Sequence, residues 1–205
     1  MVELEKKTQD ALSLEREAHD AGYALVCGVD EAGAGPLAGA VYAAAVILPE
    51  RFDLPYLNDS KKVTPKRREA LFDEIQRQAV AWAIASVDEW EIDHINILNA
   101  RLKAMEKAIQ QLDPRADFAL IDGNRNAGIT IPNRMVIHGD SLSASISAAS
   151  ILAKVARDRY MLEMAQQYPE YRFEQHKGYG TKLHYEMLRK YGPCPIHRLT
   201  FLKNL

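Results

Sequence analysis

Short apolar runs alternate along the chain with longer segments whose apolar residues recur at helical spacing. The short runs predict strands over residues 25–29, 41–48, 80–87, 118–121 and 134–138. Helical spacing predicts helices over residues 67–78, 92–112 and from about 139 to 168. This alternation favours an α/β fold in which helices flank one central sheet, followed by a helical C-terminal region.

The chain divides by pattern into two parts. Residues 2–19 predict a polar helix with a thin apolar stripe, ending near Gly22. We therefore expect residues 1–20 to form an N-terminal helical appendage and residues 21–205 to form one main domain. A length of 205 residues with 47% hydrophobic residues suffices for a single main core.

Composition bears on where the protein works. The longest uncharged stretch, residues 32–49, is interrupted by glycines and a proline, so no membrane segment is expected. Charges stand near the N-terminus where a secretory signal would have its apolar stretch. Two cysteines without paired spacing indicate neither a disulfide framework nor a zinc site. We expect a cytoplasmic monomer with reduced thiols.

The net charge of −2 conceals an uneven distribution. Residues 151–205 contain ten basic and five acidic side chains, and a second basic run occupies residues 61–68. A basic C-terminal region could face phosphate groups, with Arg189, Lys190 and Arg198 on that face. A plain solvated surface is the competing interpretation of the same charges.

Four acidic residues stand where a predicted strand stops or a helix begins: Asp30, Glu31, Asp122 and Asp140. Open α/β sheets place their sites outside such strand ends. Neighbouring strand residues point to opposite faces, so Asp30 and Glu31 share a site only if Glu31 lies beyond the last paired residue. Asp140 is expected at or near a helix N-cap, where the exposed N–H groups favour its charge.

Four carboxylates gathered without cations would repel one another, and bound divalent ions would remove this repulsion. Ligation by carboxylates alone selects hard ions such as Mg²⁺ or Mn²⁺. Two such ions can activate water and stabilise the leaving oxygen of a phosphodiester. The competing interpretation is that these acids are turn formers and helix caps.

Six segments in the same order resemble the bacterial type 2 ribonucleases H, the ribonuclease HII family, and the likeness runs from about Tyr23 to the C-terminus. They are Gly-Val-Asp-Glu-Ala-Gly at 28–33, Leu-Asn-Asp-Ser-Lys-Lys at 57–62, Ile-Asp-Gly at 121–123, Gly-Asp-Ser at 139–141, Ser-Ala-Ala-Ser-Ile-Leu-Ala-Lys-Val-Ala-Arg-Asp at 147–158 and His-Lys-Gly-Tyr-Gly-Thr at 176–181. The resemblance implies an RNase H-like fold, with a central mixed sheet flanked by helices, for a catalytic domain of residues 21–205 that includes the helical C-terminal region. It also implies that two divalent ions, Mn²⁺ or Mg²⁺, are bound by Asp30, Glu31, Asp122 and Asp140.

The implied reaction is metal-dependent cleavage of the RNA strand of RNA–DNA hybrids, and cleavage 5′ of single ribonucleotides embedded in duplex DNA. The products carry 3′-hydroxyl and 5′-phosphate ends, and the activity serves RNA primer removal and ribonucleotide excision repair. The implied partners are therefore the hybrid and ribonucleotide-containing DNA.

The resemblance also implies a set of substrate contacts. In the family a Gly-Arg-Gly loop senses the ribose 2′-hydroxyl, but here Ala34 stands at the arginine position. Losing such a charge-assisted bond costs on the order of 1.5–3 kcal/mol, which predicts weakened activity. A tyrosine stacks on the sugar, and two polar residues contact backbone phosphates. The implied substrate-binding residues are Gly33, Ala34, Gly35, Ser60, Lys61 and Tyr179.

Two other functions are compatible with these residues. A hybrid-binding protein with little turnover would follow if the alanine at position 34 removed most of the activity. Another nuclease of the RNase H-like superfamily, such as a junction resolvase or an integrase-like enzyme, would share the four acids, although the Tyr179 motif argues against it. Substrate preference distinguishes these two functions from that of a type 2 ribonuclease H.

Overall fold

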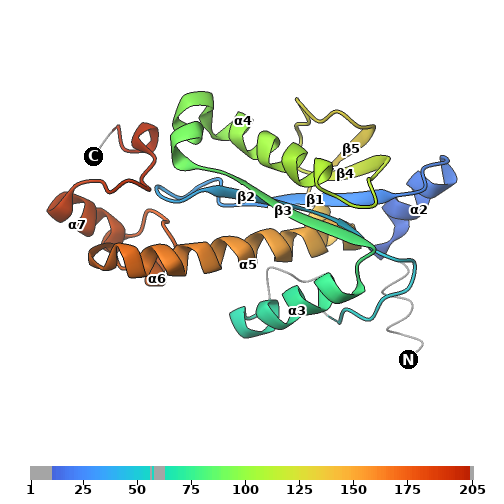
Figure 1. Cartoon of the computed structure of the whole chain (residues 1–205), viewed down its shortest axis with the longest axis horizontal. Coiled ribbons are helices and arrows are strands. Elements are labelled where there is room, and N and C mark those ends of the chain that lie inside the picture. Colours follow the sequence, from blue (N-terminus) through green and yellow to red (C-terminus); the bar gives the residue numbers. More distant parts are fainter. Residues whose placement is uncertain (1–10, 56, 58–62, 204–205) are drawn as a thin grey trace.

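The computed structural model describes residues 11–55, 57 and 63–203, whose strands form one mixed five-stranded sheet (Figure 1). Ser60 and Lys61 lie outside the described residues. The strand order is β3-β2-β1-β4-β5. The strands are β1 (Val26–Ala32), β2 (Val41–Ile47), β3 (Ala81–Val87), β4 (Phe118–Asp122) and β5 (Asn133–Val136). β2 is antiparallel to β1 and β3, whereas β4 runs parallel to β1 and β5. The predicted α/β fold with a mixed sheet is confirmed.

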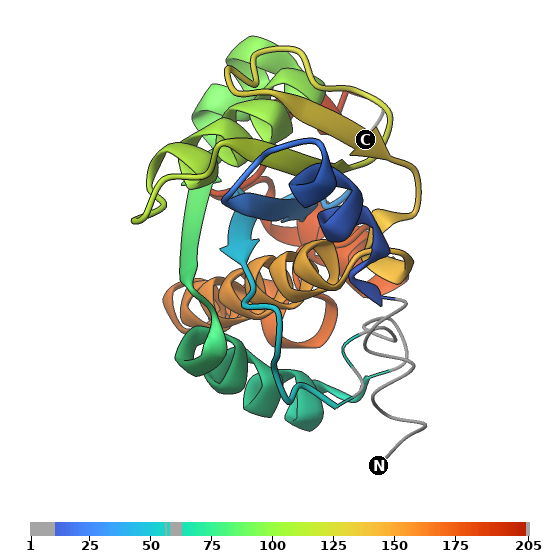
Figure 2. The same cartoon turned by 90° about the vertical axis from the view of Figure 1, so that its right-hand side faces the viewer.

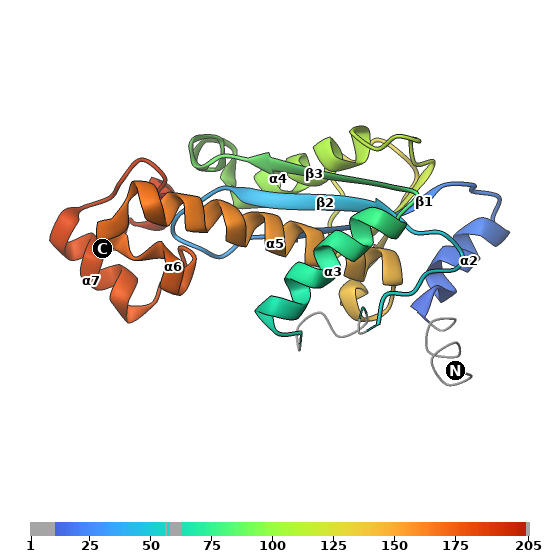
Figure 3. The ribbon, with the colours of Figure 1, turned by 60° about the horizontal axis from the view of Figure 1, so that its bottom comes forward.

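Helices cover both faces of the sheet, as Figure 2 shows end-on. α4 (Glu89–Gln110) covers one face, and α5 (Ala144–Gln167) covers the other together with α3 (Pro65–Gln78), which packs beside it (Figure 3). Each face has its own apolar core, because alternate residues of each strand point to opposite sides. Cys27 and Val29 of β1 belong to the α4 core.

α5 approaches β1 so closely that one position must be glycine. A methyl group on Gly28 would lie 2.1 Å from the backbone nitrogen of Ile146 in α5. No side chain fits into that space. The glycine therefore lets α5 run directly across β1, next to the acids that follow it in the strand.

The C-terminal region forms a small layer at the end of α5 (Figure 1). It contains η3 (Pro169–Tyr171), α6 (Phe173–His176), α7 (Lys182–Tyr191) and η4 (Leu199–Phe201), where η denotes a short 3-10 helix. Its apolar cluster packs Phe173 and Leu188 against Leu37, in the connection between β1 and β2. The helical C-terminal region is thereby joined to that loop.

The N-terminal helix α2 (Ser13–Asp20) contacts β1 and β4. Its buried Glu15 accepts hydrogen bonds from the hydroxyl of Ser143 at 2.6 Å and from the backbone of Ser145 at 3.0 Å, at the start of α5. The part of the predicted helix in residues 1–10 lies outside the described residues. No helix among the residues described here is long and apolar enough to cross a membrane.

Candidate active site

The first two acids lie inside β1 rather than beyond its end. Asp30 pairs with Ala44 and Glu31 pairs with Ala43 of β2, so the condition that Glu31 lies beyond the last paired residue is not met on the β2 side. The physical reason is that β2 extends the ladder as far as Ala32. The parallel partner β4 stops pairing at Val29, so both acids adjoin the free end of β4. They therefore point to opposite faces at a place where one side of the strand is open.

Asp30 is buried on the α5 face, with 6% of its surface exposed. Its Oδ1 accepts a hydrogen bond from the backbone N–H of Glu31 at 2.7 Å. Burial raises the pKa of Asp30 well above its usual range, and the charges of Glu31 and Asp122 raise it further. A hydrogen bond from Ser150 opposes this shift without cancelling it. Three carboxylates thus act on one another electrostatically.

Glu31 points to the α4 face, where Arg101 Nη1 donates to its Oε1 at 3.1 Å. Burial raises the pKa of Glu31, the arginine charge opposes this shift, and the charge of Asp122 adds to it. Arg101 was not among the residues expected from the sequence. The signal for it was weak, because one arginine in a long amphipathic helix is ordinarily a solvated side chain.

Asp122 ends β4, and its Oδ1 accepts a hydrogen bond from the backbone N–H of Gly139 at 2.7 Å. Asp140 follows in the 3-10 helix η2 (Gly139–Ser141) and is 6% exposed. The predicted continuous helix from residue 139 is wrong, since α5 begins at Ala144 and its N-cap is Ser143. The Gly139–Asp122 bond nevertheless joins the segments that carry the third and fourth acids.

The four acids offer carboxylate oxygens, the ligands that hard divalent cations take. Among the described residues, no three acidic, histidine or cysteine side chains converge closely enough to hold an ion as they stand. Glu31 Oε2 is buried and has no hydrogen-bond partner within the described part of the chain, so it retains unused coordination capacity. Mutually repelling carboxylate oxygens are the donor set that hard cations prefer. The chemistry of the residues fits the ions, and binding requires side-chain rearrangement.

The loop after β1 and the Tyr179 turn lie side by side. Leu37 donates its backbone N–H to the carbonyl of Gly178 at 2.8 Å. A methyl group on Gly35 would lie 4.0 Å from Cε1 of Tyr179, whose surface is 42% exposed. The fold therefore brings Gly33, Ala34 and Gly35 next to an exposed tyrosine ring. The expected phosphate contacts Ser60 and Lys61 remain predictions.

Arg198 holds the conformation of this loop. It was expected on a basic surface, but it is 0% exposed, so that expectation is wrong. Its guanidinium donates to the carbonyls of Gly33, Ala34, Pro36 and Gly39 at 2.6–3.1 Å. A planar fork with five N–H donors suits such a ring of carbonyls. Arg198 thus holds the loop through the loop's own backbone carbonyls, a contact that the sequence gives no sign of.

Arg157 of α5 joins the same loop to the Tyr179 turn. It is fully buried and donates to the carbonyls of Ala38, Ala40 and Lys177 at 3.1–3.2 Å. Its side chain fills the space beside Gly33, which has φ +96 and whose added methyl group would overlap the arginine. Its guanidinium carbon lies 5.7 Å from the centre of the Tyr179 ring. Two buried arginines therefore fix the relative position of loop and tyrosine.

Two histidines beneath the Tyr179 turn form a chain of hydrogen bonds. His184 Nδ1 donates to the carbonyl of Tyr179 at 3.0 Å, which leaves its Nε2 to accept from His197 Nε2 at 3.0 Å. His197 Nδ1 in turn accepts from the backbone N–H of Cys194 at 2.9 Å. The chain requires both rings to be neutral. Burial lowers the pKa of each histidine to about 4.

The histidine chain predicts that the protein loses stability in mild acid. The unfolded histidines take up protons near pH 6.5, whereas the folded ones resist until about pH 4, so the contribution is complete above pH 6.5 and declines as the pH falls toward 4. The expected loss is on the order of 2 kcal/mol for each histidine. Urea unfolding at pH 7.5, 6 and 4.5 measures it.

The matched variants are His197→Gln, which removes one of the buried titrating groups, and His19→Gln, on the exposed end of α2. The first is expected to flatten the decline in stability, and the second is expected to leave it unchanged. Parallel pH profiles for the wild type and His197→Gln would contradict the interpretation.

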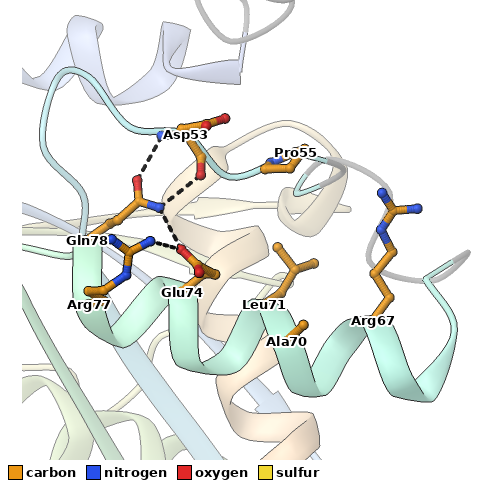
Figure 4. A pocket seen from close by; sticks show the side chains of 8 residues that line it. All are labelled: Asp53, Pro55, Arg67, Ala70, Leu71, Glu74, Arg77 and Gln78. Atoms are coloured by element: carbon orange, nitrogen blue, oxygen red, sulfur yellow. Dashed lines mark hydrogen bonds and ion pairs between the residues drawn. The ribbon is translucent and has the colours of Figure 1, made fainter.

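A surface pocket of about 640 Å³ lies beside α3, away from the four acids (Figure 4). Its polar groups satisfy one another. Gln78 exchanges two hydrogen bonds with the backbone of Asp53, at 2.8 and 2.9 Å, and Glu74 pairs with Arg77. These bonds attach the segment before residue 55 to α3. The pocket is therefore a packing feature rather than part of the candidate site.

Solved structures with the same arrangement are ribonucleases H of types 2 and 3. A ribonuclease H2 from Pyrococcus horikoshii OT3 is 26% identical, with a TM-score of 0.70 over 86% of this chain and 93% of that one. Bst-RNase HIII, solved in complex with Mn²⁺, has a TM-score of 0.65 at 18% identity, over 85% of this chain and 65% of that one. The fold is that of this nuclease class, whose members depend on divalent metal ions and act on RNA–DNA hybrids.

Sequence comparison identifies the branch of that class. The family model for ribonuclease HII matches residues 27–204. A ribonuclease HII from Caldicellulosiruptor bescii is 50% identical over 197 residues, which cover 96% of each chain. The chain belongs to the ribonuclease HII family, and it is a type 2 ribonuclease H, an endoribonuclease. The resemblance stated from the six segments is confirmed.

Proposed function

We propose that this enzyme cleaves the RNA strand of RNA–DNA hybrids and cuts 5′ of single ribonucleotides in duplex DNA, leaving 3′-hydroxyl and 5′-phosphate ends. This activity would serve primer removal and ribonucleotide excision repair in the cytoplasm, with the enzyme acting as a monomer. One observation carries the proposal. Three carboxylates act on one another electrostatically, two of them lie next in the chain to the Gly33–Gly35 loop, and this loop adjoins the exposed ring of Tyr179.

The proposed metal ligands are Asp30, Glu31, Asp122 and Asp140, which would hold two ions, Mg²⁺ or Mn²⁺. Bound ions of this kind activate water and stabilise the leaving 3′ oxygen. The chain itself supports this assignment: β1 and β4 carry three of the acids, and the Asp122–Gly139 bond attaches the segment that carries the fourth. Oxygen ligands of this kind favour hard ions over zinc.

The loop and the tyrosine are proposed to read the sugar. Gly33, Ala34 and Gly35 would bring backbone groups to the ribose 2′-hydroxyl, and the exposed Tyr179 ring would stack on the neighbouring sugar. Ser60 and Lys61 would contact backbone phosphates, which set register rather than sequence preference. A 2′-hydroxyl distinguishes RNA from DNA at one position.

The direct test uses two duplexes that differ in one 2′-hydroxyl. Cleavage in Mg²⁺ or Mn²⁺ is expected at the single ribonucleotide, with none in the all-DNA duplex and none when the ions are chelated. The Asp122→Asn variant should bind the duplex and leave it uncut. Equal cleavage of both duplexes would contradict the reading of the sugar and favour a different RNase H-like nuclease.

A second test concerns Ala34. Introducing arginine at this position (Ala34→Arg) is expected to raise kcat/KM by about 10- to 100-fold, the worth of one charge-assisted hydrogen bond to a phosphate. Ala34→Gln is the matched control, because it adds length without charge. If the wild type binds the hybrid without turnover and Ala34→Arg restores cleavage, the hybrid-binding alternative holds. If Ala34→Arg changes neither binding nor rate, position 34 has no such role.

A further inference from the structure

Arg101 places a fixed positive charge inside the proposed metal site. It extends from α4, and its Nη1 donates to Glu31 Oε1 at 3.1 Å. Only 20% of the arginine side chain and 14% of the glutamate side chain are exposed, so water screens the pair poorly. Glu31 faces α4 because it shares a side of β1 with Val29, two residues earlier.

The ion pair is incomplete on both sides. An arginine and a carboxylate can form two parallel hydrogen bonds, but this pair forms one. Glu31 Oε2 and Arg101 Nε are both buried without hydrogen-bond partners in the described segments. Buried polar atoms left unpaired are costly. Little free energy is therefore lost if Glu31 exchanges the guanidinium for a better partner. A divalent cation would be such a partner for the carboxylate.

The guanidinium also adjoins the end of β4. A methyl group on Gly123, the residue after Asp122, would lie 3.6 Å from Arg101 Nη2. The positive charge therefore lies near a second proposed ligand as well as next to Glu31. The net charge that attracts a cation is reduced by one unit.

We propose that Arg101 is a positioning residue that pairs with Glu31 and competes with divalent cations for it. This inference rests on the proposed function, since it assumes that Glu31 is a metal ligand. A cation must displace the guanidinium from Oε1, and it binds against the repulsion of a positive charge in a poorly screened site. Arg101 thus sets the concentration of metal at which the site fills.

The experiment measures Mn²⁺ binding to the metal-free protein without nucleic acid, by titration at one pH with free Mn²⁺ detected by electron paramagnetic resonance. Arg101→Gln is expected to bind Mn²⁺ about tenfold more tightly than the wild type. Arg101→Lys, which keeps the charge without the planar fork, is expected to fall between them.

Arg159→Gln is the matched control, because Arg159 pairs with Glu69 between α5 and α3 rather than with any of the four proposed ligands. It should bind Mn²⁺ as the wild type does. Circular dichroism and urea unfolding establish that each variant is folded. Equal or weaker binding by folded Arg101→Gln would overturn the inference.

The Asp122→Asn variant distinguishes a failure of the inference about Arg101 from a failure of the proposed metal site. If this variant loses Mn²⁺ binding while Arg101→Gln matches the wild type, the metal site stands and the role of Arg101 fails. If Asp122→Asn binds Mn²⁺ as tightly as the wild type, the proposed site fails, and the inference about Arg101 fails with it.

Discussion

Replacing Asp30 with asparagine is expected to remove most of the cleavage activity and to make the metal-free protein more stable. Burial and two neighbouring carboxylates disfavour the charged form of Asp30, so the folded state bears a cost that a neutral amide of the same shape removes. Asparagine retains an oxygen to accept the hydrogen bond from Glu31. We expect a gain of about 0.5–2 kcal/mol in the free energy of unfolding and a loss of about 10³-fold in kcat.

The pH dependence of that gain has a definite sign. Because the pKa of Asp30 is raised in the folded state, the wild type loses stability relative to Asp30→Asn as the pH rises above 3.8, until the folded carboxyl has ionised. Urea unfolding across that range measures the difference, and duplex cleavage assays measure the rate. Asp73→Asn, on the exposed face of α3, is the control. An Asp30→Asn variant that is less stable than the wild type, or as active, would contradict the assignment.

Replacing Arg198 with methionine is expected to be the most destabilising of these changes. Methionine fills much of the space, but it leaves three buried carbonyls and one part-buried carbonyl without their donors. Each unsatisfied buried group costs on the order of 1–3 kcal/mol, and partial rearrangement of the loop reduces the sum. We expect the free energy of unfolding to fall by about 3–5 kcal/mol, measured by urea denaturation.

Arg198→Lys and Arg189→Met complete that comparison. Lysine keeps the charge and offers three donors without the planar geometry, so its loss should be intermediate. Arg189 is exposed on α7, and its replacement is expected to change stability by at most about 0.5 kcal/mol. For folded Arg198→Lys, KM for the ribonucleotide-containing duplex should rise because the Gly33–Gly35 loop is less well held. Equal stability of Arg198→Met and Arg189→Met would show that the carbonyl contacts contribute little.

Much of the fold follows from local patterns. The five strands were predicted within a few residues, since apolar runs of strand length bounded by glycine, proline or charge are local signals. The C-terminal end of β1 was predicted three residues too early, because the length of β1 depends on β2, which pairs with it as far as Ala32. The start of α5 was misplaced for a related reason: a 3-10 turn carries Asp140 before the true N-cap at Ser143. Boundaries of this kind depend on partners distant in the chain.

What the sequence determined by itself is the five strands, the long helices and the family, and it proposes the four acids as ligands, because these features reside in short segments and their order. Only the tertiary structure decided that Asp30 and Glu31 face opposite sides of the sheet, that Arg101 reaches Glu31, and that Arg198 is buried under the loop rather than exposed. The physical reason is that each of these facts depends on which surface covers a side chain. For the two arginine contacts the covering residues lie 70 and 165 positions away in the sequence.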